Sequence, residues 1–237
     1  MSVNRRIPLK VQSMHPETVL IIAPHPDDET LGCGGTILKL KDRGASVHWL
    51  IVTTIEGVSD FPKERVAARA QEIELVREAY DFDEVHQCYL PAAALDTLGK
   101  GELIGAIGSV IKKLRPDCIY IPYRNDAHSD HAAVFDASVS AAKIFRAPFV
   151  KAIYTYETLS ETDFGLRPED PGFRPNLYED ITGYLDKKIY IMSLFDGEMG
   201  EFPFPRSEEC LRALATLRGA QANCHAAEAF MILKEIR

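Results

Sequence analysis

Two short stretches of this chain combine histidine with several carboxylates. The first is Pro24-His25-Pro26-Asp27-Asp28-Glu29, between the apolar run 19–23 and the glycine-rich run 31–35. The second is Asn125-Asp126-Ala127-His128-Ser129-Asp130-His131, which follows another apolar run. Imidazole nitrogens and carboxylate oxygens are common ligands of catalytic zinc. Because charge of this density is costly unless a cation binds it, we expect a divalent metal, zinc first, and hydrolytic chemistry.

Strands and helices that would position these residues alternate along most of the chain. Apolar runs predict strands at residues 18–23, 46–54, 84–90, 117–122 and 149–156. Helical spacing of apolar residues and terminating signals predict helices at residues 30–43, 63–80, 103–114 and 131–145. Such alternation predicts an α/β fold in which a mainly parallel sheet carries helices on both faces, in three layers.

The sequence changes character after residue 156. Prolines recur in residues 160–180 and 196–206, which we expect to form loops over the carboxyl edge of the sheet. Further helices are expected at residues 184–192, 207–218 and 226–235, and residues 1–16 are expected to add at most one short strand. Because no linker or repeat divides the chain, residues 1–237 are expected to form a single domain.

Both polar stretches begin where a predicted strand ends. In open α/β sheets, ligands bind outside the carboxyl ends of the strands. The stretch 24–29 follows the strand 18–23 and the stretch 125–131 follows the strand 117–122, so they can meet if these two strands lie near each other. Capping carboxylates beside ordinary histidines are the alternative. Two such stretches at equivalent strand ends favour a metal site over that alternative.

These motifs resemble those of the LmbE-like or PIG-L-type de-N-acetylase family. The similar segments are residues 24–36, 69–72, 125–131, 218–219 and 227–230, nearly the length of the chain. The resemblance implies a Rossmann-like sandwich and a zinc-dependent enzyme that removes acetyl from N-acetylglucosamine-type sugars and their conjugates. The segment 220–225 lacks the glycine that the late family motif often carries, which leaves the identity of the substrate open.

The resemblance also implies roles for individual residues of the first motif. His25, Asp28 and His131 correspond to the zinc ligands of the family, although another divalent metal could occupy the same site. Asp27 corresponds to the general base. Neighbouring side chains in an extended loop diverge, so one carboxylate can face the metal while the other faces the attacking water.

Three further residues correspond to helper positions in the family. His128 would stabilise the oxyanion or help to protonate the leaving amine, and Asp130 would orient an imidazole. Alternatively, Asp130 caps a helix that begins at His131. Arg69 corresponds to an arginine that reaches the substrate. Its alternative is a helix-face charge that pairs with Glu72, three residues later.

The overall composition limits the class of partner and the compartment. A net charge of −8 and a pI of about 5.4 argue against nucleic acid or an anionic membrane as the main partner. The five cysteines are widely spaced without a CxxC pair, and no apolar run reaches the length of a membrane span. We therefore expect a cytoplasmic protein with a small-molecule N-acetylated sugar or sugar conjugate as its partner, and, from its relatives, a homo-oligomer.

Two other functions remain open at the level of sequence. One is hydrolysis of a different amide or ester on an amino-sugar or thiol conjugate, and the other is a non-catalytic metal-binding protein. Asp27 beside a complete set of ligands argues against the second, because a closed structural metal site needs no base.

Overall fold

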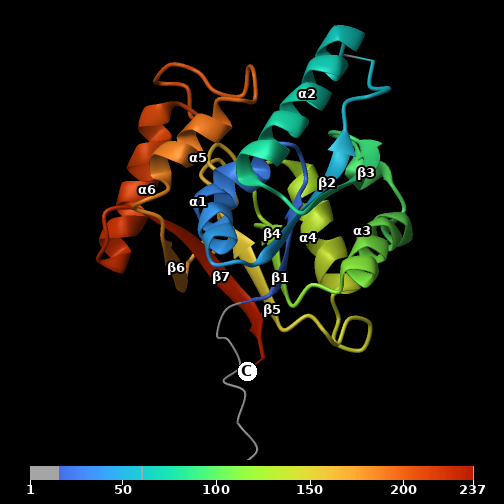
Figure 1. The fold of residues 1–237 in the computed structure, drawn as a ribbon. Coiled ribbons are helices and arrows are strands. Elements are labelled where there is room, and N and C mark those ends of the chain that lie inside the picture. The colour runs from blue at the N-terminus through green and yellow to red at the C-terminus, as the bar shows by residue number, and fades with distance from the viewer. Residues whose placement is uncertain (1–15, 60, 237) are drawn as a thin grey trace, which may run out of the picture.

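The structure is a computed structural model that describes residues 16–59 and 61–236 (Figure 1). Its strands are β1 (Thr18–Ala23), β2 (Ser46–Thr54), β3 (Glu84–Pro91), β4 (Cys118–Pro122), β5 (Ala152–Tyr156), β6 (Leu177–Asp180) and β7 (Ala227–Glu235). Its α-helices are α1 (Asp28–Asp42), α2 (Lys63–Tyr80), α3 (Lys100–Leu114), α4 (Ser129–Ala141), α5 (Leu185–Met192) and α6 (Glu208–Ala222). A short 3-10 helix covers Leu95–Thr97. Within the described part of the chain, none of these helices has the length and apolar character needed to cross a bilayer.

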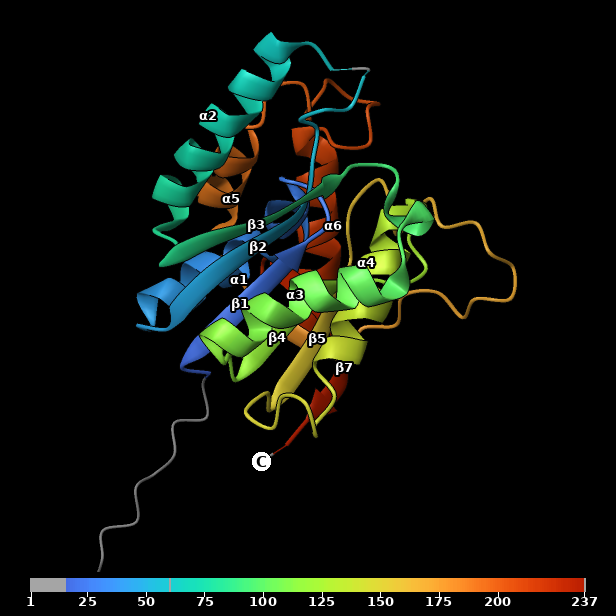
Figure 2. The same ribbon diagram turned by 90° about the vertical axis from the view of Figure 1, so that its right-hand side faces the viewer.

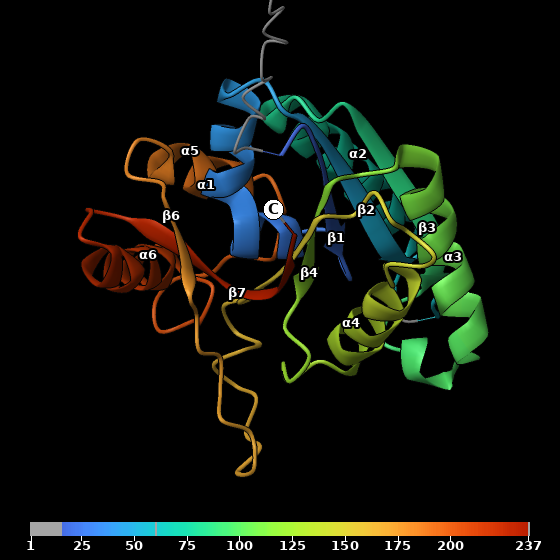
Figure 3. The ribbon, with the colours of Figure 1, turned by 90° about the horizontal axis from the view of Figure 1, so that it is seen from below.

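The strands form one mixed sheet in the order β3-β2-β1-β4-β5-β7-β6. Strands β1 to β5 are parallel, and β7 runs antiparallel to both β5 and β6. Helices α1, α2, α5 and α6 cover one face, and α3 and α4 cover the other (Figures 2 and 3). The predicted α/β sandwich is therefore confirmed.

The central strands are apolar throughout because both of their faces are buried. In β1, Val19 and Ile21 pack into the core beneath α1 and α2, whereas Leu20 and Ile22 pack into the core beneath α3 and α4. All four side chains are fully buried. The continuous apolar run thus supplies both layers of core at once, which makes β1 a rigid base for the loop that follows it.

The order of the strands switches sides at β1. It adds β2 and β3 on one side of β1 and then returns to add β4 and β5 on the other side. The loops that leave β1 and β4 therefore separate at the same carboxyl edge, which is where α/β sheets bind ligands. The pairing of β1 with β4 brings the two polar stretches of the sequence together.

The last segment differs from its predicted structure. The sequence predicts a helix over residues 226–235, but residues 227–235 form β7, and the sequence pattern predicts no strand where β6 lies. Ala, Glu, Met and Leu favour helices, yet pairing with β5 and β6 on both sides overrides this weak preference. The strand considered within residues 1–16 falls almost entirely on residues 1–15, outside the described part of the chain.

Helix α1 lies unusually close to its neighbours because it contains glycines. A Cβ atom on Gly32 would stand 2.7 Å from the ring carbon Cγ of Tyr156 on β5. On the same helix, the buried carboxylate of Glu228 on β7 accepts hydrogen bonds from the amides of Gly35 and Thr36, at 2.8 and 2.7 Å. Lys188 on α5 bonds Glu228 at 2.7 Å. These contacts fix the position of α1, whose first residue belongs to the site described next.

Candidate metal centre and active site

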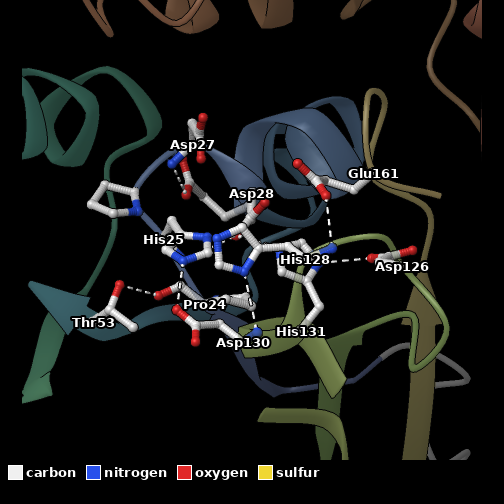
Figure 4. Close-up of polar contacts among 12 residues, drawn as sticks. Pro24, His25, Asp27, Asp28, Thr53, Asp126, His128, Asp130, His131 and Glu161 are labelled. Atoms are coloured by element: carbon white, nitrogen blue, oxygen red, sulfur yellow. Dashed lines mark hydrogen bonds and ion pairs between the residues drawn. The ribbon is translucent and has the colours of Figure 1, made fainter. Parts of the chain in front are cut away.

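The site lies where β1 and β4 end (Figure 4). His25 follows β1, Asp28 is the first residue of α1, and His131 lies in the first turn of α4. Asp28 and His131 are almost completely buried, and the His25 side chain is 22% exposed. The three side chains converge from two stretches that are far apart in sequence, as the order of the strands requires.

The distances from Asp28 to the two predicted histidine ligands match those of a tetrahedral metal site. One oxygen of Asp28, Oδ2, lies 3.3 Å from Nδ1 of His25 and 3.3 Å from Nε2 of His131. All three ligand atoms lie within 4.8 Å of one another. Tetrahedral zinc with bonds of about 2.0–2.1 Å holds its ligand atoms about 3.3–3.4 Å apart. The residues present therefore fit zinc, with three protein ligands and one position for water or substrate.

A second carboxylate stands behind each of the two histidine ligands. Nδ1 of His131 lies 2.7 Å from Oδ2 of the buried Asp126. Nε2 of His25 lies 3.0 Å from Oδ2 of Asp130, which is buried as well. Such partners fix the orientation of an imidazole and make its other nitrogen a better ligand. The expectation that Asp130 orients an imidazole is consistent with this contact.

The trio of His25, His128 and Asp130 also falls within metal-binding distance. The Asp130 carboxylate, however, already accepts backbone hydrogen bonds from Ala93 at 2.7 Å and from Leu95 at 3.0 Å. With His25 as its third partner, this carboxylate has little capacity left for a cation. A cation would therefore find more free ligand capacity between His25, Asp28 and His131, the trio predicted from the sequence.

Helix α4 is capped by a histidine and not by an aspartate. His128 occupies the N-cap position, and its Nδ1 accepts a hydrogen bond from the Asp130 amide at 3.2 Å. The alternative that Asp130 caps this helix is therefore wrong, since Asp130 already lies in the first turn. Burial, followed by the nearby His25, lowers the pKa of His128 and keeps its imidazole neutral. A neutral imidazole that accepts at Nδ1 carries its proton on Nε2, so His128 can act as a hydrogen-bond donor.

Asp27 combines an unusual backbone with an uncommitted carboxylate. It is the N-cap residue of α1, but its side chain makes no capping hydrogen bond. Its φ of 133° and ψ of −29° lie where residues other than glycine rarely occur, at a cost of about 1–3 kcal/mol. Burial, together with the charges of Asp28 and Glu198, raises the pKa of this carboxyl well above its usual range. A buried carboxyl with a raised pKa next to a metal site is suited to proton transfer.

Arg69 lies on α2 and reaches the loop after β1. Its guanidinium donates to the backbone oxygen of Pro26 at 2.9 Å and also bonds Glu198. It lies 3.2 Å from Glu72 as well, so the helix-face ion pair considered from the sequence is present. A contact between Arg69 and a substrate stays a prediction.

Without a bound cation, the two histidines of the trio bind protons more readily than ordinary histidines do. Burial lowers the pKa of His25, but hydrogen bonds to Asp130 and Asp28 outweigh burial and raise it to about 9. Burial also opposes charge on His131, yet Asp28 and Asp126 hold its pKa well above the ordinary value. The same histidines overcome the effect of burial on Asp28 and keep its pKa below the usual range. The cluster thus favours positive charge at its centre.

The metal-free protein should therefore lose stability as the pH rises from about 6.5 to 9. The pKa of His25 is about 9 in the folded state against an ordinary 6.5, so the folded state binds more protons between these values. Burial raises the pKa of Glu29 to about 8, which acts in the same direction. We expect urea unfolding in the presence of a chelator to show that the free energy of unfolding falls by on the order of 1–3 kcal/mol over this pH range. His25→Gln should flatten this profile, and a midpoint that rises over the range would contradict the assignment.

Several site residues received no role from the sequence. Asp126 belonged to the second stretch, and its position five residues before His131 was the available signal. Glu161 accepts a hydrogen bond from the His128 amide at 3.0 Å, and Glu198 pairs with Arg69 and Arg206. Glu161 and Glu198 come from the proline-rich loops, which lie at the carboxyl edge as predicted. No local pattern distinguishes these two glutamates from surface charges.

Comparison with known proteins shows the same architecture in deacetylases. A diacetylchitobiose deacetylase of Thermococcus kodakarensis is 28% identical over 228 residues, which cover 89% of this chain and 80% of that protein. The solved structure of N,N'-diacetylchitobiose deacetylase from Pyrococcus horikoshii in complex with its inhibitor MPG has a TM-score of 0.75 at 21% identity, covering 92% of this chain and 84% of that one.

A third neighbour carries out a different reaction. GalB of Pseudomonas putida KT2440, a 4-carboxy-2-hydroxymuconate hydratase, has a TM-score of 0.74 at 18% identity and covers 93% of this chain and 98% of its own. At this level of identity the likeness shows the fold alone. The model of the family PIG-L, described as GlcNAc-PI de-N-acetylase, matches residues 20–142, which hold both polar stretches. The chain therefore belongs to the PIG-L family of de-N-acetylases, amidohydrolases that act on carbon–nitrogen bonds.

Proposed function

We propose that this protein is a zinc-dependent hydrolase that removes the acetyl group from an N-acetylated amino sugar or sugar conjugate. One observation carries the proposal: Oδ2 of Asp28 lies 3.3 Å from a nitrogen of each of His25 and His131, all three ligand atoms lie within 4.8 Å of one another, and the buried Asp27 directly precedes Asp28. The relative from Thermococcus kodakarensis, named for a diacetylated disaccharide, supports a sugar as the substrate.

The metal and its neighbours would divide the chemistry between them. A divalent cation held by His25, Asp28 and His131 would polarise the acetamide carbonyl and lower the pKa of a bound water. Asp27 accepts the proton that the water loses as its oxygen forms a bond with the carbonyl carbon. The Nε2–H of neutral His128 donates to the oxygen that becomes negative in the tetrahedral state.

The second half of the reaction returns the proton. Asp27 passes it to the amine nitrogen, the carbon–nitrogen bond breaks, and acetate and a free amino sugar leave. The raised pKa of Asp27 suits both steps, because burial makes this carboxyl hold a proton more readily than an ordinary aspartate does. Asp126 and Asp130 hold the two imidazole ligands throughout.

An acetate-release screen tests the proposal. The zinc-loaded protein should release acetate from N-acetylglucosamine, diacetylchitobiose or a nucleotide-linked N-acetyl sugar, and a chelator should abolish the release until zinc is restored. Acetylated thiol conjugates and simple esters belong in the same screen. Release from these alone would replace the amino-sugar substrate with another amide or ester. Turnover that persists in the metal-free protein would refute the metal-dependent mechanism.

A further inference from the structure

One peptide group in the loop after β1 is held at both of its polar ends. The carbonyl oxygen of Pro26 and the amide of Asp27 belong to the same peptide unit. The oxygen accepts from Nη1 of Arg69 at 2.9 Å, and the amide donates to Oε2 of Glu29 at 3.1 Å. Arg69 comes from α2 and Glu29 from the first turn of α1, so two separate helices hold this single peptide.

The orientation of this peptide determines the backbone conformation of Asp27. A φ of 133° is strained for aspartate. Rotation of the Pro26–Asp27 peptide plane would change that φ and relieve the strain. The same rotation would break the bonds to Arg69 and Glu29 and would redirect the Asp27 side chain. Strain of this kind persists only where the surroundings enforce it.

Both groups that hold the peptide are themselves fixed. Glu29 is fully buried, and its other oxygen accepts from the Thr30 hydroxyl at 2.6 Å, which in turn accepts from the Tyr80 hydroxyl at 3.2 Å. Arg69 is tied to Glu198 and lies over the Phe195 ring, 5.6 Å from its centre. Neither side chain can follow the peptide if it rotates.

We propose that Arg69 and Glu29 are positioning residues that clamp the Pro26–Asp27 peptide and thereby fix the direction of the Asp27 side chain, the neighbour in sequence of the predicted ligand Asp28. This inference rests on the proposed role of Asp27 as the base. It gives Arg69 a task that needs no contact with substrate, and it gives Glu29 a task beyond a favourable charge at the start of α1. The clamp acts on the proton-transfer step, so it should affect kcat and leave metal binding unchanged.

Amide hydrogen exchange tests the clamp without any substrate. In the metal-free protein, Arg69→Met should speed exchange of the Asp27 amide at least about tenfold, although Arg69 does not contact that amide. Exchange of the Ile21 amide in β1 should stay unchanged, which excludes global destabilisation. Arg77→Met, on the exposed face of the same helix and paired with Glu74, is the matched control and should have no effect. An unchanged Asp27 amide in Arg69→Met would overturn the proposal.

Steady-state kinetics with diacetylchitobiose as the substrate provide a second test of the clamp. Arg69→Met should lower kcat at least about tenfold with KM and zinc content unchanged, whereas an arginine that binds substrate would raise KM. Glu29→Met should lower kcat in the same way. Glu29→Gln should keep a kcat closer to that of the wild type, because its amide oxygen can still accept the hydrogen bond from the Asp27 amide. The double variant should lose no more than the worse single variant, since both act on one peptide. Additive losses would refute a shared clamp. If no sugar is turned over at all, the proposed function fails while the exchange result still decides the clamp.

Discussion

The Asp27→Asn protein should retain its zinc and release acetate about 10³-fold more slowly than the wild type. Asparagine keeps the size of the side chain and tolerates a positive φ better than most residues, so the loop after β1 should keep its conformation. The amide cannot accept the proton of the attacking water. The loss should therefore appear in kcat, with KM and the metal content close to those of the wild type.

Asp163→Asn is the matched control for this variant. Asp163 is an exposed carboxylate on the loop after β5, close in sequence to Glu161, and it belongs to neither group of side chains within metal-binding distance. Acetate release should be equal to that of the wild type. Near-normal turnover by Asp27→Asn, with zinc confirmed by elemental analysis, would remove Asp27 from the role of base.

The His131→Ala protein should lose both its metal and its activity. His131 is one of only two imidazoles in the proposed ligand set, and its buried ring is held on the opposite side by Asp126. Removing it leaves two protein ligands, too few to retain zinc against a chelator. Elemental analysis after dialysis should find less than about a tenth of the wild-type zinc, and acetate release should fall at least about 10³-fold.

Two further variants test whether the loss of zinc is specific to the ligand His131. Asp126→Asn leaves the three ligands in place but weakens the group that orients His131, so zinc affinity should fall about 10- to 100-fold. His48→Ala removes a buried histidine of β2 that lies outside the site, and it should keep its full zinc content. Zinc retained by His131→Ala would show that the metal lies elsewhere, for example between His25, His128 and Asp130.

The sequence by itself determined most of the frame and the chemistry. The apolar run of β1 predicts a strand buried on both faces, and all of its residues from Val19 to Ala23 are buried. Two stretches of histidine and aspartate predict a metal site at the ends of two strands. Their spacing does not say which of these side chains would bind the metal, and only the resemblance to the PIG-L family singles out His25, Asp28 and His131 as the predicted ligands.

Only the tertiary structure decided what depends on contacts between distant segments. The adjacency of β1 and β4 brings Asp28 within 3.3 Å of His131, and no local pattern specifies the order of strands in a sheet. The strand β7 exists because β5 and β6 pair with it, against the helical preference of its residues. The start of α4 at His128 and the strained φ of Asp27 likewise depend on tertiary contacts. Short-range spacing therefore specified which groups can do chemistry, and long-range packing specified how they are held.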